Sequence, residues 1–268
     1  MSDDRWLVHR HFAEQNNQRL DFVTAEPKQI LLFGADGDCS RKLLAERYPK
    51  AAFAEYDGRA DFLAAAAEAR GTGWLAKLAG KTVPQTCQAA DAPLPEASAD
   101  MLWANLGLIQ ADAPLPVFEQ WGKALKTDGL LFFTHFGRDS LAELLGRLKN
   151  EAGIECEAPM FFDMHDLGDM LPDSGFYDPV MDTAKLQLDY RSAETFWQDM
   201  ETLGVWQSLR FADKAAEAAA RAALNRWVSD GLSVTLETVY GHAVKKNVLP
   251  AGESPVQFYP RRPSEKKA

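Results

Sequence analysis

Metal-ligand and redox motifs are missing from this sequence. Its three cysteines, Cys39, Cys87 and Cys156, lie far apart and form no C-x-x-C pair. Its five histidines form no H-E-x-x-H arrangement. The sequence therefore predicts reduced, unpaired thiols and no metal site.

Positive charge is also scarce. The 268 residues include 29 Lys and Arg against 39 Asp and Glu, which gives a formal net charge of −10. A nucleic-acid backbone is bound through clustered cations, so this balance argues against a nucleic-acid partner. The hydrophobic share of 46% is that of a globular protein. The length suits one large domain over residues 1–268.

Long apolar runs are scarce as well. The longest ones, such as Leu130–Phe133, are too short to cross a bilayer. The first residues, MSDDRWLVHRHF, contain no apolar core of a secretion signal. We therefore expect a cytoplasmic protein without a membrane partner.

The sequence does contain an alternation of short apolar runs with helical patterns. The runs predict strands, and the segments after them, with apolar residues three or four apart, predict helices. We expect strands at 29–33, 51–56, 82–88, 100–105 and 130–135, and helices at 40–48, 60–70, 117–126 and 139–148. Such repeats build the doubly wound α/β fold, a mostly parallel sheet with helices on both faces.

The last of these helices carries a start signal. Ser140 and Glu143 have the spacing of a capping box, in which the serine hydroxyl and the glutamate carboxylate bond each other's backbone N–H groups. We therefore expect Ser140 to cap this helix.

The last third of the chain changes character. Leu186, Leu188 and Tyr190 alternate with polar residues, as do residues 234, 236 and 240, and this period predicts half-exposed strands. The segments 192–203 and 212–229 between them predict helices. The two strands can therefore pair as antiparallel neighbours with the helices looping out, and we interpret residues 192–230 as an inserted lid.

The turn after the first strand is the candidate ligand site. Ligands of open α/β sheets bind beyond the carboxyl ends of the strands, where the strand order reverses. Gly34 and Gly37 let a ligand approach the backbone there, and the helix N-terminus behind them favours an anionic group. Asp57, after the second strand, is placed to accept two ribose hydroxyls, although an acid at such a position is as often only a turn former.

Long motifs in the second half of the chain resemble one family. They read FDMHDLGDMLPDSGFYDPVMD at 162–182, LQLDYR at 186–191, TLETVYGHAV at 235–244 and QFYPRR at 257–262. These motifs are similar to those of the malonyl-acyl-carrier-protein O-methyltransferases of biotin synthesis (the BioC family), which are class I S-adenosylmethionine-dependent methyltransferases. WANLGLIQ at 103–110 and ALKTDGLLFFTHFGRDSLAEL at 124–144 extend the resemblance through the middle.

The resemblance implies a Rossmann-like, seven-stranded, mostly parallel sheet with a helical insert between the last two strands. It implies S-adenosylmethionine as cofactor and a malonyl thioester on acyl carrier protein as acceptor. Gly34 would lie under the methionine part of the cofactor, Asp57 would take the ribose hydroxyls, and Asn105 would face the sulfonium. Either Gln88 or Asp91 would read the adenine.

The acceptor side is less sharply marked. The malonyl carboxylate is already ionised, so the transfer needs positioning and no general base, and we predict no catalytic side chain. His165, Asp166 and Asp169 are candidates to line the acceptor, and Arg191 to pair with a phosphate or carboxylate. The alternatives are a helix-capping Asp166 and a surface Arg191. The nearest basic cluster for an acidic carrier is Arg41, Lys42, Arg47 and Lys50.

The glycine turn departs from the family's pattern. Leu32 stands where an acid is usual, and Asp36 and Asp38 stand where the second and third glycines are usual. Two interpretations are open: Asp36 supplies the missing acid and binds the cofactor together with Gly34 and Gly37, or it repels the cofactor's carboxylate. The second leads to an alternative function, a catalytically inactive methyltransferase-like binding or regulatory protein.

Overall fold

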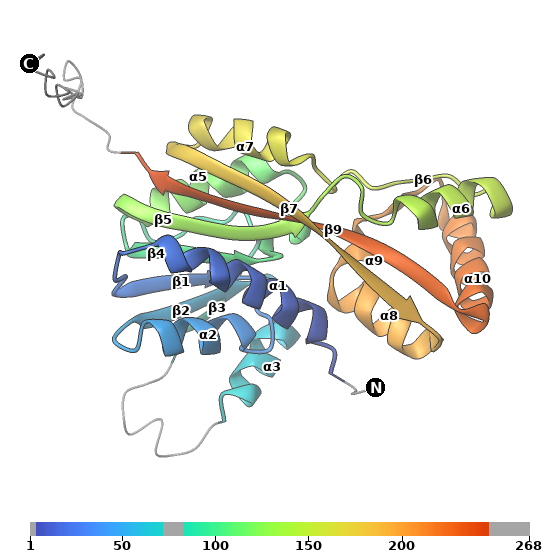
Figure 1. Ribbon diagram of the computed structural model, residues 1–268, viewed down its shortest axis with the longest axis horizontal. Coiled ribbons are helices and arrows are strands. Elements are labelled where there is room, and N and C mark those ends of the chain that lie inside the picture. The colour runs from blue at the N-terminus through green and yellow to red at the C-terminus, as the bar shows by residue number, and fades with distance from the viewer. Residues whose placement is uncertain (1–3, 72–82, 247–268) are drawn as a thin grey trace, which may run out of the picture.

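The computed structural model describes residues 4–71 and 83–246 of the chain, so the QFYPRR motif lies outside the described residues. Its centre is a seven-stranded sheet with the order β3-β2-β1-β4-β5-β9-β7 (Figure 1). Strands β1 to β5 are parallel, and β9 runs antiparallel to both of its neighbours. The strands are β1 (Gln29–Phe33), β2 (Ala52–Asp57), β3 (Gln85–Cys87), β4 (Ala99–Asn105), β5 (Leu125–Phe136), β7 (Phe176–Tyr190) and β9 (Leu232–Lys245). The predicted fold class is confirmed.

Helices cover both faces of the sheet. Strand residues alternate between the faces, so Ile30 and Leu32 pack toward one side while Leu31 and Phe33 pack toward the other. On one side lie α1 (Leu7–Gln18), η1 (Arg19–Phe22) and α2 (Cys39–Arg47), and on the other lie α5 (Pro114–Ala124) and α7 (Met164–Asp173) (Figure 1). The helix α3 (Ala60–Ala69) follows β2, and η2 (Gly107–Gln110) follows β4. No helix among the residues described is long and apolar enough to cross a membrane.

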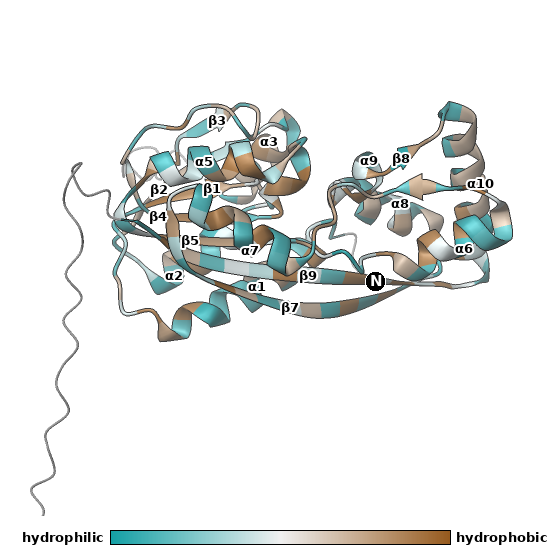
Figure 2. Cartoon of the chain, turned by 90° about the horizontal axis from the view of Figure 1, so that it is seen from above, coloured by the Kyte–Doolittle hydropathy of each residue, from teal (hydrophilic) through white to brown (hydrophobic). Residues whose placement is uncertain are grey.

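The antiparallel pair β7 and β9 extends beyond the other strands. The predicted pairing is confirmed, because Leu186 pairs with Leu236 and Leu188 with Val234. Helices gather around its far end and form what we call the distal lobe, which is linked to the sheet by these two strands (Figure 2). The distal lobe consists of α6 (Ala142–Ala152), β6 (Cys156–Glu157), α8 (Ala193–Thr202), α9 (Val205–Ser208), β8 (Arg210–Phe211) and α10 (Lys214–Asp230).

The predicted capping box is wrong. Helix α6 begins at Ala142, after Leu141 in the left-handed region with φ 59°. The hydroxyl of Ser140 instead donates to the backbone oxygen of Glu237 at 2.9 Å and accepts from its N–H at 3.0 Å. The Ser140 hydroxyl, which the sequence pattern assigned to the start of the helix, is therefore hydrogen-bonded to strand β9 instead.

We predict opposite effects for two Gly→Ala substitutions. At Gly241, in the Y-G-H-A motif, an added Cβ would lie 2.3 Å from Cε1 of buried Phe133. Gly241→Ala should therefore lower the free energy of unfolding by about 1–3 kcal/mol, the usual effect of overpacking. Gly146, inside α6, has nothing within 4 Å of an added Cβ. Gly146→Ala should therefore raise the free energy of unfolding by about 0.5–1 kcal/mol. Denaturant titration measures both, and equal effects would contradict the packing argument.

Candidate active site

The candidate site lies at the carboxyl ends of β1, β2 and β4, where the strand order reverses. The first turn there is built around Gly34, which has φ 90° and whose N–H donates to the Tyr56 oxygen at 2.9 Å. A Cβ at this position would lie 2.7 Å from the Asn105 oxygen. Only glycine fits, because the turn passes directly over the end of β4.

Asp36 joins this turn to β4. Its carboxylate is 2% exposed and accepts from the Ser40 hydroxyl at 2.6 Å, from the Ser40 N–H at 3.2 Å and from Asn105 Nδ2 at 2.8 Å. Asn105 is itself held by the Thr134 hydroxyl at 2.8 Å and donates to the His9 oxygen at 3.0 Å. Through these bonds Asp36 braces the turn after β1 against the end of β4.

Asp38 takes the left-handed backbone conformation that glycine usually supplies, with φ 72°. Its charge is matched by Arg41, which donates to both carboxylate oxygens at 2.6 and 2.5 Å, and by Arg70 at 3.0 Å. Arg47, from the same predicted basic cluster, pairs with Asp21 at 2.6 Å. Ion pairs within the protein thus engage two of the four cations proposed to receive an acidic carrier.

Asp57 is fully buried at the end of β2, and its carboxylate makes four hydrogen bonds. One oxygen accepts from the Arg59 N–H at 2.7 Å and from Arg59 Nε at 3.0 Å. The other accepts from the Ala35 N–H at 2.7 Å and from an Arg59 terminal nitrogen at 2.8 Å. The Arg59 guanidinium also lies over the Phe62 ring, 3.5 Å from its centroid. Sequence reasoning missed Arg59, and the only available signal was a cation two residues after the candidate acid.

Helix α1 brings aromatic groups to the same site. Trp6 covers the turn, because a Cβ on Gly37 would meet its ring at 2.5 Å, and it packs edge-on against Phe62 and His9. Burial, with the nearby Arg59 and Arg5 charges, lowers the pKa of His9 to about 3. His9 is therefore a neutral ring at physiological pH.

Two buried polar atoms at the site have no hydrogen-bond partner in the described part of the chain. Gln110 accepts from the Gly58 N–H at 3.2 Å, which joins η2 to the end of β2. Among the residues that the structure describes, Gln110 Nε2 and His9 Nδ1 have no hydrogen-bond partner. Buried polar groups are normally satisfied, so these two atoms are unused hydrogen-bonding groups beside the carboxyl ends of the strands.

The remaining predicted site residues lie in different places. Half-buried Gln88 is at the edge of the site, where its N–H donates to the Asp57 backbone oxygen at 3.1 Å. His165 is exposed in the first turn of α7, which is capped by Asp163 and not by Asp166. Arg191 is exposed after β7, at the end of that strand opposite to α7 (Figure 1). The structure thus groups the cofactor candidates and leaves the two acceptor candidates apart.

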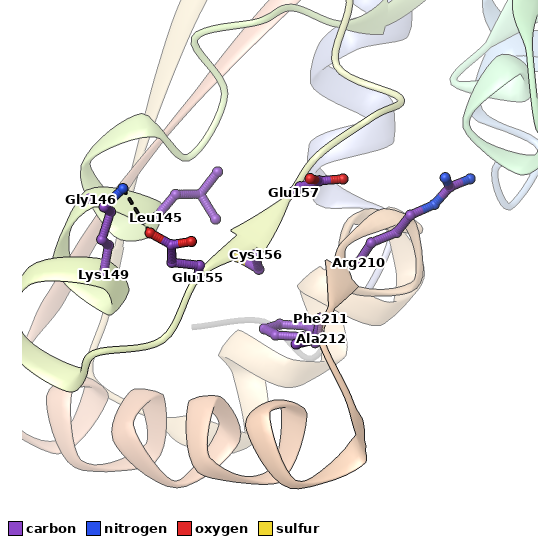
Figure 3. A pocket seen from close by; sticks show the side chains of 9 residues that line it. All are labelled: Leu145, Gly146, Lys149, Glu155, Cys156, Glu157, Arg210, Phe211 and Ala212. Carbon is purple, nitrogen blue, oxygen red and sulfur yellow. Dashed lines mark ion pairs between the residues drawn. The ribbon is translucent and has the colours of Figure 1, made fainter.

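A hollow lies in the distal lobe, between α6, β6 and β8 (Figure 3). Its volume is about 570 Å³, and its walls include Leu145, Phe211 and the half-buried Cys156, whose thiol pKa is raised by burial. At its rim Lys149 pairs with Glu155 at 2.9 Å. None of its lining residues belongs to the strand ends that carry Asp57 and Asn105.

Sequence comparison finds named relatives over nearly the whole chain. The malonyl-[acyl-carrier protein] O-methyltransferase of Laribacter hongkongensis is 30% identical over 273 residues, covering 96% of this chain and 91% of that protein. The protein of the same name from Gallionella capsiferriformans is 32% identical and covers 89% and 84%. No family model matches the chain.

Structure comparison supports the fold. The YcgJ protein of Bacillus subtilis superposes with a TM-score of 0.58 at 13% identity, covering 90% of this chain and all of that one. A phosphoethanolamine N-methyltransferase of Haemonchus contortus, solved with S-adenosylhomocysteine, superposes with a TM-score of 0.54 at 16% identity, covering 87% of this chain and 53% of the other. At these identities the likeness concerns the fold alone.

Asp36 gives a pH-dependent prediction. Burial raises its pKa from 3.8 to about 6. The folded protein therefore holds the proton of the Asp36 carboxyl more tightly than the unfolded chain does. The stabilisation of the fold by this protonation is present below about pH 4 and is lost as the pH rises through 6. Asp36→Asn stays uncharged, so relative to wild type its free energy of unfolding should rise by on the order of 3 kcal/mol between pH 4 and pH 7. Urea titrations at the two pH values measure this, and a pH-independent difference would contradict it.

Proposed function

The chain belongs to the family of malonyl-[acyl-carrier protein] O-methyltransferases, and we propose that it methylates the free carboxylate of a malonyl thioester on acyl carrier protein, with S-adenosylmethionine as donor, in biotin synthesis. The observation that carries this proposal is identity of 30–32% over most of the length of relatives with that name. The sheet order and the position of Asp57, Gly34 and Asn105 at the strand ends support it.

The residues at the strand ends fit S-adenosylmethionine in kind. Asp57 offers a carboxylate for a ribose diol, and Gln110 Nε2 and His9 Nδ1 offer unused polar atoms. The cofactor supplies an electrophilic methyl group. We assign its binding to Gly34, Asp36, Gly37, Asp57, Gln88 and Asn105, with Asp36 acting through its bond to Asn105.

This chain's own contribution to methyl transfer is positioning. The malonyl carboxylate is ionised near neutral pH, so the protein holds its oxygen in line and excludes water, with no general base. We propose that residues 192–230 cover the acceptor as a lid. Support comes from the entry to α9, where a Cβ on Gly204 would lie 3.1 Å from Ile109 of η2, so the lid contacts the loop after β4. His165 and Arg191 remain the proposed acceptor contacts.

A second candidate function is a non-enzymatic binding protein that kept the fold. The observation that favours it is the carboxylate of Asp57, whose four acceptor positions are filled by Ala35 and Arg59. Leu32, which packs in the core in place of the family's acid, points the same way. Calorimetric titration separates the two functions, because only the enzyme must bind the methyl donor.

We predict that wild-type protein binds S-adenosylmethionine and that Asp57→Ala weakens binding at least tenfold, because a two-point charge-assisted contact is lost. Asp57→Asn, which keeps the side-chain shape, tests the same contact if the alanine variant folds poorly. Asp139→Ala, which removes an exposed ion pair with Lys185, is the control and should leave affinity unchanged.

The activity is tested in the same preparation by mass spectrometry of malonyl-acyl carrier protein. Formation of the methyl ester by wild type is expected. If wild type gives neither binding heat with S-adenosylmethionine or S-adenosylhomocysteine nor a methyl ester, the enzymatic proposal is wrong and the binding-protein alternative stands.

A further inference from the structure

The arrangement of donors around Asp57 divides into a fixed pair and a movable pair. Each carboxylate oxygen accepts one backbone N–H, from Arg59 or from Ala35, and one guanidinium nitrogen of Arg59. A carboxylate has about four acceptor positions, so none is free. The backbone donors are part of the turns, whereas the guanidinium is the end of a flexible side chain.

We propose that the Arg59 guanidinium is an internal stand-in for the ribose diol and sets the affinity of the cofactor site. The inference rests on the proposed function. The two guanidinium donors occupy one acceptor position on each oxygen of Asp57. A vicinal diol presents two donors in the same way, so the ligand replaces the fork one hydrogen bond for one while the bonds from Ala35 and the Arg59 backbone remain.

The surroundings of Arg59 fit a side chain that can leave. Its side chain is 21% exposed, whereas that of Asp57 is completely buried. It rests on the Phe62 ring, which is held edge-on by Trp6 at 5.0 Å between centroids. Phe62 stays in place on α3, so the guanidinium can move toward solvent without disturbing the turns.

The quantitative consequence concerns cofactor affinity. A ligand that binds only when Asp57 is free has a raised apparent dissociation constant. It equals the intrinsic dissociation constant divided by the fraction of molecules in which Asp57 is free. If Arg59 occupies the carboxylate nine-tenths of the time, its removal tightens binding about tenfold.

Calorimetric titration with S-adenosylhomocysteine tests this in wild type, Arg59→Gln and Arg59→Lys. Arg59→Gln should bind about tenfold more tightly, and Arg59→Lys should be intermediate, because lysine keeps the charge but lacks the fork. The lysine variant also keeps a test available if the glutamine variant folds poorly. Arg147→Gln is the matched control, since the Arg147 guanidinium also lies over an aromatic ring, that of Trp227, and pairs with a carboxylate, that of Glu151, but on α6 of the distal lobe. Its affinity should equal that of wild type.

A double-mutant cycle tests the mechanism. If Arg59 competes for the carboxylate, the gain from Arg59→Gln should disappear in an Asp57→Asn background. Unchanged or weaker binding by Arg59→Gln, or the same gain in both backgrounds, would overturn the inference while wild-type binding keeps the proposed function intact. Absence of heat in every variant, wild type included, would overturn both.

Discussion

The buried carboxylate of Asp57 is the group on which the arrangement of the site depends. A charge out of contact with water must be paired and hydrogen-bonded. Here the N–H of Ala35 satisfies it from the turn after β1, and Arg59 satisfies it from the turn after β2. The carboxylate therefore fixes both turns, and the same requirement fills all of its acceptor positions.

The altered glycine turn also depends on the pairing of its carboxylates. The two aspartates that replace glycines do not face each other as unpaired charges: Asp36 is bonded to Ser40 and Asn105, and Asp38 is bonded to Arg41 and Arg70. Asp38 also adopts the positive φ that its position requires. The turn thus keeps its backbone shape through side-chain pairs, and the departure from the family's pattern is compatible with an intact site.

Much of the fold could be predicted from the sequence, because it depends on local patterns. The range 29–33 matches β1 without change, and the alternation at 186–190 and 234–240 identifies the β7 and β9 pair. The position of Gly34 and Asp57 at neighbouring strand ends follows from the parallel order. The start of a helix was predicted less well, because the Ser140 hydroxyl, the expected helix cap, bonds to β9, which is distant in sequence.

The side chains that contact the site from other elements could not be predicted in the same way. Trp6, which precedes α1, reaches Gly37, and Gln110 reaches Gly58 from η2, so each contact depends on how whole elements pack. Arg59 is adjacent in sequence, but a D-G-R run alone does not say whether the cation faces the acid or solvent. His165 lies in α7 and Arg191 follows β7, so the place of one relative to the other also depends on how whole elements pack.

The central claim is that one carboxylate serves Arg59 and the ligand in turn. It is tested most directly by a crystal structure of the protein with S-adenosylhomocysteine. The account predicts both ribose hydroxyls on Asp57, with the N–H groups of Ala35 and Arg59 still bonded and the guanidinium displaced. A complex in which the guanidinium keeps both hydrogen bonds to Asp57 while the ribose binds elsewhere would contradict it.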